Sequence, residues 1–166
     1  MNIKYYFRKK YISTIIETER ERYIFFFRNS YKDNFKHAQF TRRTFPRWSI
    51  ISGYYAMHDI TKLLLAQQFN IKVDFKVHNT TITLMSLLVK DNWLQRQIKQ
   101  GYKEFLTLAN DLEEAHAQRT KTQYYTGSSF SKEQATKKAE QFLNEIVILY
   151  LKKVSQLLKS HDNTTN

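Results

Sequence analysis

The side chains that come nearest to a chemical motif lie in residues 112–125, LEEAHAQRTKTQYY. Arg119 follows His116 by three residues and precedes Gln123 by four, so the three share one face of a helix. That face continues an apolar stripe, where a guanidinium is paired with a carboxylate, lies at a seam between subunits or lines a cleft. Arg119 and His116 are therefore candidate site residues. An arginine whose stem merely covers apolar surface is the alternative.

Two tyrosines follow this arginine, and Tyr124 stands five positions after Arg119. An ordinary phenol, with a pKa of about 10, is a poor general base at neutral pH. Its ring can nevertheless stack on a nucleic-acid base, and its hydroxyl can hydrogen-bond a phosphate. Tyr124 and Tyr125 are therefore candidate binding residues, together with Arg119.

Two histidines are further candidates for binding RNA or a nucleotide. His58 lies on an apolar stripe and is either a hydrogen-bonded core group or a binding residue. His78 opens a predicted helix and is either a simple terminal residue or part of the same site. The chain has no HExxH motif, no glycine-rich phosphate loop and no carboxylate pair, and its five histidines are scattered. We therefore expect no metal and no cofactor.

Positive charge is concentrated in the first part of the chain. The net charge is +12, and residues 1–50 hold 12 Lys or Arg against four Asp or Glu. Such an excess favours an anionic partner, either nucleic acid or an acidic protein, although a basic surface also keeps a protein soluble. Arg42, Arg43 and Arg47, with Pro46 fixing the chain between them, are the candidate lining of an anion-binding groove for RNA.

The elements that must position these residues are predicted to be long helices. Only three glycines and one proline occur in 166 residues, which disfavours a turn-rich sheet. Cysteine is absent, which excludes disulfides and thiolate sites. Apolar residues recur at helical spacing over 3–30, 47–69, about 78–90, 92–125 and from 131 to the tail. The predicted fold class is all-α, a helical bundle.

Local signals sharpen the boundaries around the second helix. Residues 31–46 break the helical period, which predicts either an interruption or a short separate helix there. Pro46 disfavours helix at Phe45 and suits the first turn of the helix that follows. Helix 47–69 is apolar on nearly all sides, a pattern typical of the central helix of a bundle.

The later helices carry their own start and stop signals. In helix 92–125, Gly101 is a point where a kink is expected, and Gly127 is a stop signal. Ser131 and Gln134 form a capping box that predicts the start of the last helix.

The length suits one domain with a real core. We divide it into a basic N-terminal helical extension packed on the core (1–46), a helical bundle (47–160) and a disordered tail (161–166). No secretory signal peptide is visible, and the longest uncharged stretch, residues 77–89, is too short to span a bilayer. We therefore expect a cytoplasmic protein with no membrane association.

Four segments in this order resemble the HEPN superfamily, and the chain looks most like its small, stand-alone prokaryotic members. The resemblance covers roughly residues 47–155. The segments are ISGYYAMHDITKLLLAQQF (51–69), KVH (76–78), LEEAHAQRTKTQYY (112–125) and SKEQATKKAEQFLNEI (131–146).

The resemblance implies an antiparallel four-helix, HEPN-like bundle with an additional N-terminal helix, commonly as a homodimer. Many members are RNA-cleaving toxins or RNA-binding modules, often encoded beside a nucleotidyltransferase-type antitoxin. Active members carry an arginine, four to six further residues and then a histidine. Their cleavage is metal-independent and uses the 2′-hydroxyl of the RNA as the nucleophile.

The chain departs from this motif at its catalytic half. Arg119 matches the arginine, but Tyr124 stands where a histidine is expected. The next histidine downstream is His161 in the tail, and His116 precedes the arginine instead of following it. The resemblance therefore implies an RNA- or nucleotide-binding protein with a degenerate ribonuclease motif. It also implies that the protein is one component of a toxin–antitoxin pair.

Two other functions remain open from the sequence. In the first, the chain is an active metal-independent endoribonuclease toxin in which His116 or His58 replaces the missing base. In the second, it is a dimeric interaction module without catalysis, whose basic N-terminal part docks on an acidic protein. Salt-dependent RNA binding separates this module from the other two functions, and cleavage in the presence of EDTA separates the nuclease from the binder.

Overall fold

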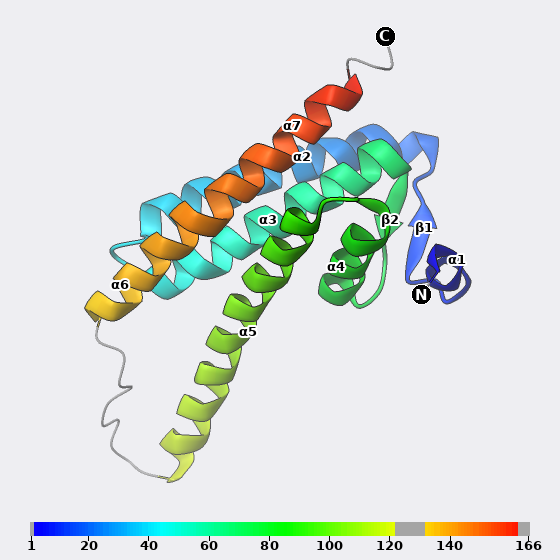
Figure 1. Cartoon of the computed structure of the whole chain (residues 1–166). Coiled ribbons are helices and arrows are strands. Elements are labelled where there is room, and N and C mark those ends of the chain that lie inside the picture. Colours follow the sequence, from blue (N-terminus) through cyan, green and yellow to red (C-terminus); the bar gives the residue numbers. More distant parts are fainter. Residues whose placement is uncertain (1, 122–131, 163–166) are drawn as a thin grey trace.

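Helices form most of this computed structural model, which describes residues 2–121 and 132–162, with side chains over 2–108 and 133–160. The predominantly helical fold expected from the sequence is confirmed. Helices α2, α3 and α7 run side by side, whereas α1 and the two strands lie at one end (Figure 1). The elements are α1 (Ile3–Arg8), β1 (Ile12–Thr14), α2 (Glu17–Thr41), α3 (Pro46–Phe69), β2 (Ile71–Val73), α4 (Val77–Leu88), α5 (Asn92–Lys121), α6 (Lys132–Gln141), the π-helix η1 (Phe142–Val147) and α7 (Ile148–Asp162).

Helix α3 is the central helix and is buried on nearly all sides, as its apolar pattern predicted. Helices α2, α4, α5, α6 and α7 all pack against it. Gly53 permits a close approach of the π-helix η1, since a Cβ there would lie 3.1 Å from the ring of Phe142 and 3.2 Å from Val147. Pro46 occupies the first turn, and Phe45 before it has non-helical backbone angles (φ −134°, ψ 68°), which confirms the predicted boundary.

The prediction of a single helix over residues 3–30 is wrong. The chain instead forms α1, the strand β1 and then α2, and β1 pairs antiparallel with β2 so that Ile12 lies opposite Val73. Both residues are buried in a small separate core to which Tyr6 and Leu84 also belong. The β-branched residues of β1 favour a strand, and burial in this core outweighs the helical spacing seen in the sequence.

The predicted break over residues 31–46 is also wrong for most of its length, because α2 continues to Thr41. Tyr31, Phe35 and Ala38 keep a spacing of three or four residues and pack in the main core. The polar residues between them hid this stripe in the sequence. Helix α2 therefore shares one continuous core with α3.

The most deeply buried positions change across the π-helix η1. Ile146 and Leu157 pack against the main core but are only partly buried, whereas their neighbours Val147 and Leu158 are buried. The π-helix η1 inserts an extra residue into a turn, and this rotates the apolar face of α7 by one position.

Helix α5 begins where the sequence predicted. The side chain of Asp91 accepts hydrogen bonds from the backbone N–H groups of Trp93 and Leu94, both at 3.0 Å, and pairs with Lys153 of α7 at 2.8 Å. The helix is continuous through Gly101.

Some of the predicted boundaries cannot be compared with the structure. The predicted helix end at 125, the stop signal Gly127 and the capping residue Ser131 lie outside the described residues, as do residues 163–166. The prediction of a disordered tail from residue 161 is wrong at its start, because α7 continues to Asp162. Within the part of the chain that the structure describes, no helix is both long and apolar enough to cross a membrane.

Candidate nucleic-acid interface

The turn from α2 into α3 carries the three arginines singled out by the charge pattern. We call residues 40–48 the α2–α3 corner. Arg42 caps the C-terminus of α2, Arg43 follows it in the turn, and Arg47 is the second residue of α3. Arg43 is exposed and the other two are half-buried. The corner therefore presents three guanidinium groups from one short stretch of chain.

Hydrogen bonds between α2 and α3 hold this corner in one conformation. The hydroxyl of Ser49 donates to the backbone carbonyl of Ala38 at 2.7 Å, and both residues are fully buried. The N–H of Phe45 donates to the carbonyl of Thr41, also at 2.7 Å. One turn further from the tip, His37 Nδ1 and Ser52 Oγ are 2.7 Å apart. The backbone of the corner is thus tied to both helices, which lowers the ordering cost that binding a ligand would carry.

Exposed aromatic rings are interleaved with the arginines of the corner. Phe40 is 85% exposed, and Phe45 and Trp48 are each 59% exposed. A patch of large exposed apolar side chains on a folded protein commonly marks an interaction site. These three residues are not among the sequence-predicted binding residues, although the alternation in FTRRTFPRW (40–48) is visible in the sequence. The missed signal is the mixture of aromatic and basic residues at a helix boundary.

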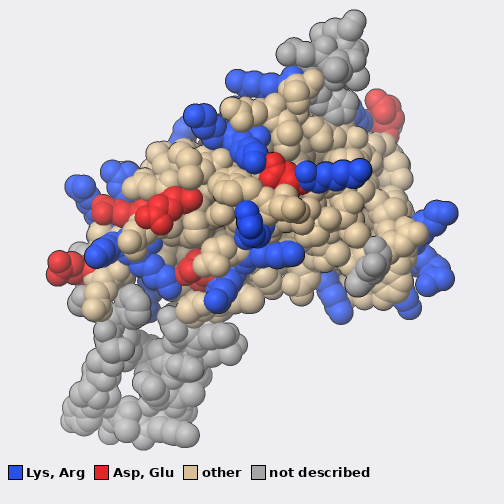
Figure 2. Space-filling model, viewed as in Figure 1, with Lys and Arg blue, Asp and Glu red and all other residues tan. Residues whose placement is uncertain are grey.

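The corner is free of acidic residues of its own, since no Asp or Glu occurs between Asp33 and Asp59. Among the described residues, an ion pair joins Arg43 Nε to Glu140 Oε1 of α6 at 3.4 Å. Figure 2 shows Lys and Arg side chains over much of one face of the molecule, with acidic side chains among them near α6. The potential at the corner is therefore positive, and α6 supplies the nearest carboxylate that the structure describes.

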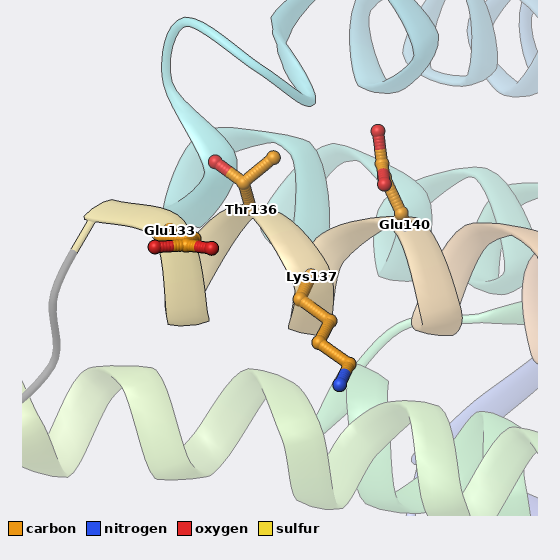
Figure 3. A pocket seen from close by; sticks show the side chains of 4 residues that line it. All are labelled: Glu133, Thr136, Lys137 and Glu140. Atoms are coloured by element: carbon orange, nitrogen blue, oxygen red, sulfur yellow. The ribbon is translucent and has the colours of Figure 1, made fainter.

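A shallow hollow of about 510 Å³ lies on α6, on the side toward the corner (Figure 3). Its described lining consists of Glu133, Thr136, Lys137 and Glu140. Figure 3 shows Thr136 and Glu140 pointing toward the α2–α3 turn, whereas Lys137 points away from it. Two carboxylates against one ammonium make this hollow a poor site for an anion. It is an acidic border to the basic corner.

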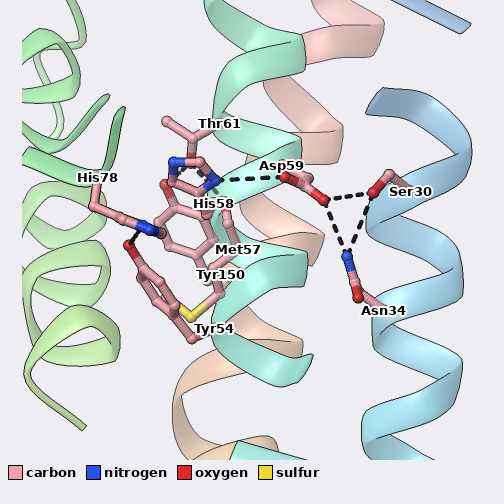
Figure 4. A network of polar contacts seen from close by, with 9 residues as sticks. All are labelled: Ser30, Asn34, Tyr54, Met57, His58, Asp59, Thr61, His78 and Tyr150. Carbon is pink, nitrogen blue, oxygen red and sulfur yellow. Dashed lines mark hydrogen bonds and ion pairs between the residues drawn. The ribbon is translucent and has the colours of Figure 1, made fainter. Parts of the chain in front are cut away.

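A second polar cluster lies where α3, α4 and α5 meet (Figure 4). His58 is buried and His78 is half-buried, and their ring centroids are 4.9 Å apart. His78 Nδ1 is 2.8 Å from the hydroxyl of Tyr54, and its ring stacks on Tyr102 at 5.6 Å. The structure therefore brings the two sequence-predicted histidines together.

Asp59 connects this cluster to α2. One of its carboxylate oxygens accepts hydrogen bonds from Ser30 Oγ at 2.6 Å and from Asn34 Nδ2 at 3.0 Å. The other lies 3.4 Å from His58 Nδ1, while His58 Nε2 has no hydrogen-bond partner among the residues that the structure describes. The carboxylate is held mainly by α2 and therefore ties α2 to α3.

Burial controls the ionisation of this cluster. Desolvation lowers the pKa of His78 below its ordinary value of 6.5, and the neighbouring His58 and Lys62 lower it further. Burial likewise raises the pKa of the Tyr54 phenol. A neutral imidazole packed between aromatic rings suits a structural layer better than an anion-binding site. Among the described side chains, no group of three His, Asp or Glu is placed to hold a metal ion.

The remaining sequence-predicted site residues lie in the C-terminal part of α5 or outside the described residues. His116 and Arg119 belong to α5, which places them three residues apart on one helix, but their side chains lie outside the described residues. Tyr124 and Tyr125 lie outside the described residues altogether. The predicted Arg119 motif therefore stays a prediction.

The structure separates two groups of predicted binding residues. Arg47 and His58 are both on α3, and eleven residues of helix correspond to roughly 16 Å along its axis. The basic corner and the histidine cluster are thus two places on the molecule.

Comparisons with models of protein families, with curated proteins and with solved structures found no match to this chain.

Proposed function

We propose that this protein binds RNA through the α2–α3 corner. The observation that carries the proposal is the composition of that corner, where three arginines and three exposed aromatic rings occur within residues 40–48. Arginine recognises phosphate with a planar fork of donors, and aromatic rings stack on bases. The net charge of +12 adds long-range attraction for a polyanion.

We place the protein in the HEPN class, as an antiparallel four-helix bundle with the N-terminal helix packed on it. The order of α3, α4, α5 and α6–α7 supports this, because the four segments of the resemblance fall on those elements in turn. The segment with the YYAM sequence forms the central helix α3, and His78 stands in the first turn of α4.

The proposed activity is binding with a degenerate catalytic motif. Tyr124 stands where an active member carries a histidine, and an ordinary phenol is a poor general base at neutral pH. Arg119 retains the charge that would hold a phosphate. We propose that it contributes to binding RNA or a nucleotide without efficient cleavage.

Assembly follows from the same proposal. Phe25 and Phe26 are exposed on α2, which supports a homodimer because such rings are commonly buried between subunits. The family resemblance supports a nucleotidyltransferase-type antitoxin as a partner in the cytoplasm. Light scattering of the purified protein, at micromolar concentration, tests the dimer.

The proposed function is tested by measuring RNA binding at several salt concentrations. Fluorescence anisotropy of a labelled RNA, with EDTA present, is the readout. The triple variant Arg42→Gln/Arg43→Gln/Arg47→Gln should bind more weakly and show a shallower dependence on salt, because fewer counterions are released. The matched control removes three exposed lysines outside the corner, one just before α5 and two on α7. They are replaced as Lys90→Gln, Lys152→Gln and Lys159→Gln.

The control variant should keep a steeper salt dependence than the arginine variant. Equal losses of RNA affinity in the two triple variants would mean that only the net charge of the protein matters, and not the position of the arginines. No salt-dependent binding by the wild-type protein would overturn the proposed function.

A further inference from the structure

The three aromatic rings of the α2–α3 corner are left out of the hydrophobic core. Phe40, Phe45 and Trp48 are each more than half exposed. The aromatic residues of the preceding α2 stripe, Tyr31 and Phe35, pack in the main core instead. Folding therefore does not account for the large side chains at the corner, and water contacts most of their surface.

The rings also remain separate from one another. No ring contact joins Phe40, Phe45 or Trp48 to another described aromatic side chain, whereas the rings of the histidine cluster stack together. Each of the three therefore keeps faces that are open to a flat ligand. Successive bases of an extended strand need such separate, open faces.

Arginines alternate with these rings along the chain, in the order Phe40, Arg42, Arg43, Phe45, Arg47, Trp48. A nucleic-acid strand likewise alternates a charged phosphate with a flat base. Single-stranded sites on proteins combine basic side chains along the backbone with aromatic side chains under the bases. The corner supplies both from one rigid turn.

A duplex makes poor use of the same surface. Its bases are already stacked and paired, and the deep major groove of A-form RNA is closed to side chains. The arginines would still contact its phosphates, but the exposed rings would gain nothing. The aromatic residues thus favour a strand whose bases are unpaired.

We propose that the α2–α3 corner selects single-stranded over duplex RNA, by stacking unpaired bases on Phe40, Phe45 and Trp48 while the arginines bind the phosphates. This rests on the proposed function and names the form of RNA that the site takes. An acidic protein partner would use the arginines as well, but it would not require three separate flat surfaces.

The test compares an oligouridylate strand of about 12 nucleotides with an RNA duplex of the same length. The binding variant is Phe40→Ala/Phe45→Ala/Trp48→Ala, and its thermal unfolding is measured alongside. Two exposed rings outside the corner and outside α2 supply the control, Phe7→Ala/Phe75→Ala. A second variant, Phe40→Tyr/Phe45→Tyr/Trp48→Phe, keeps a stacking ring at each position.

We expect the wild-type protein to bind the strand more tightly than the duplex. The alanine variant should lose tenfold or more in affinity for the strand and little for the duplex, so the preference disappears. The Tyr and Phe variant should retain the preference, and so should the Phe7 and Phe75 control.

Two results separate this inference from the proposed function. If the wild-type protein binds strand and duplex equally, with a steep salt dependence, the selection is overturned while RNA binding stands. If it binds neither, both fail. An alanine variant that remains folded and keeps its preference for the strand would also overturn the inference.

Discussion

The guanidinium of Arg43 lies 3.4 Å from the carboxylate of Glu140, so one ion pair joins the α2–α3 corner to α6. The side chain of Arg43 is 76% exposed and that of Glu140 is 37% exposed. Pairs this open to solvent contribute little to the free energy of unfolding. Their effect on a ligand is greater, because a phosphate must compete with Glu140 for the same donors.

Glu140→Gln should therefore raise the affinity for RNA by a few-fold and leave the melting temperature nearly unchanged. The change removes a negative charge beside Arg43 and frees its guanidinium. Anisotropy titrations at low salt measure the effect, and Glu145→Gln, at an exposed position on η1, is the control. Equal gains in the two variants would show that only net charge matters.

The titration of His78 should make the fold less stable in mild acid. Its pKa is lowered in the folded state, chiefly by burial, so the unfolded chain binds the proton more readily. The contribution of neutral His78 to the free energy of unfolding is therefore fully present above pH 6.5. It is lost as the pH falls from 6.5 through the lower pKa of the folded state. His78→Gln removes this titration while keeping a group that can hydrogen-bond Tyr54.

Urea unfolding at several pH values measures this effect. The difference between wild type and His78→Gln should change with pH below about 6.5 and remain constant above it. The nearby groups His58, Asp59 and Lys62 are present in both proteins, so their common contribution cancels to first order. A difference that does not vary with pH would contradict the prediction.

The two described glycines should respond in opposite ways to alanine. In Gly53→Ala the new methyl group meets Phe142 at 3.1 Å and Val147 at 3.2 Å, and both are buried. Overpacking there should cost about 1–3 kcal/mol, more than the helix propensity of alanine returns. In Gly101→Ala the neighbour is the flexible end of Met57, so the variant should be neutral or stabilised by up to about 1 kcal/mol. Urea unfolding compares them, and similar losses would show that Met57 cannot move.

Tyr124→His restores the spacing Arg-x4-His after Arg119. If the motif is a decayed ribonuclease site, this variant should cleave RNA in the presence of EDTA. Adding Arg119→Ala should abolish that cleavage.

Arg119→Ala alone should weaken RNA binding modestly with the fold intact. Gel analysis of total RNA and thermal unfolding provide the readouts, and a large loss of melting temperature with unchanged RNA affinity would assign Arg119 a structural role.

The long helices could be predicted because burial leaves a period in the sequence. Helix α3 is apolar on all sides and sits at the centre, and Pro46 marks its start. The strand β1 could not be predicted from its neighbours, since Ile12 is held by Val73, far along the chain. The π-helix was missed for a related reason. Its extra residue is accommodated by packing on α3 and leaves no periodic signal of its own.

The candidate sites were predictable only as far as charge and spacing reach. The three corner arginines were identified because they follow one another closely in a basic region. The exposure of Phe40 and Trp48 could not be predicted, because an aromatic residue at a helix end is equally compatible with the core. The proximity of His58 and His78 depends on how α4 folds back on α3, which no local pattern specifies.

The pairing of Ile12 with Val73 also sets an order of events during synthesis, since the second residue is made 61 positions after the first. At about 5–20 residues per second, the ribosome needs roughly 3–12 s to supply the partner strand. Helices α2 and α3 lie between the two strands in the chain and pack against each other, so we expect their contacts to form before the strands pair. We therefore expect the amino-terminal strand to emerge early, wait unpaired, and close onto a helical hairpin that has already formed.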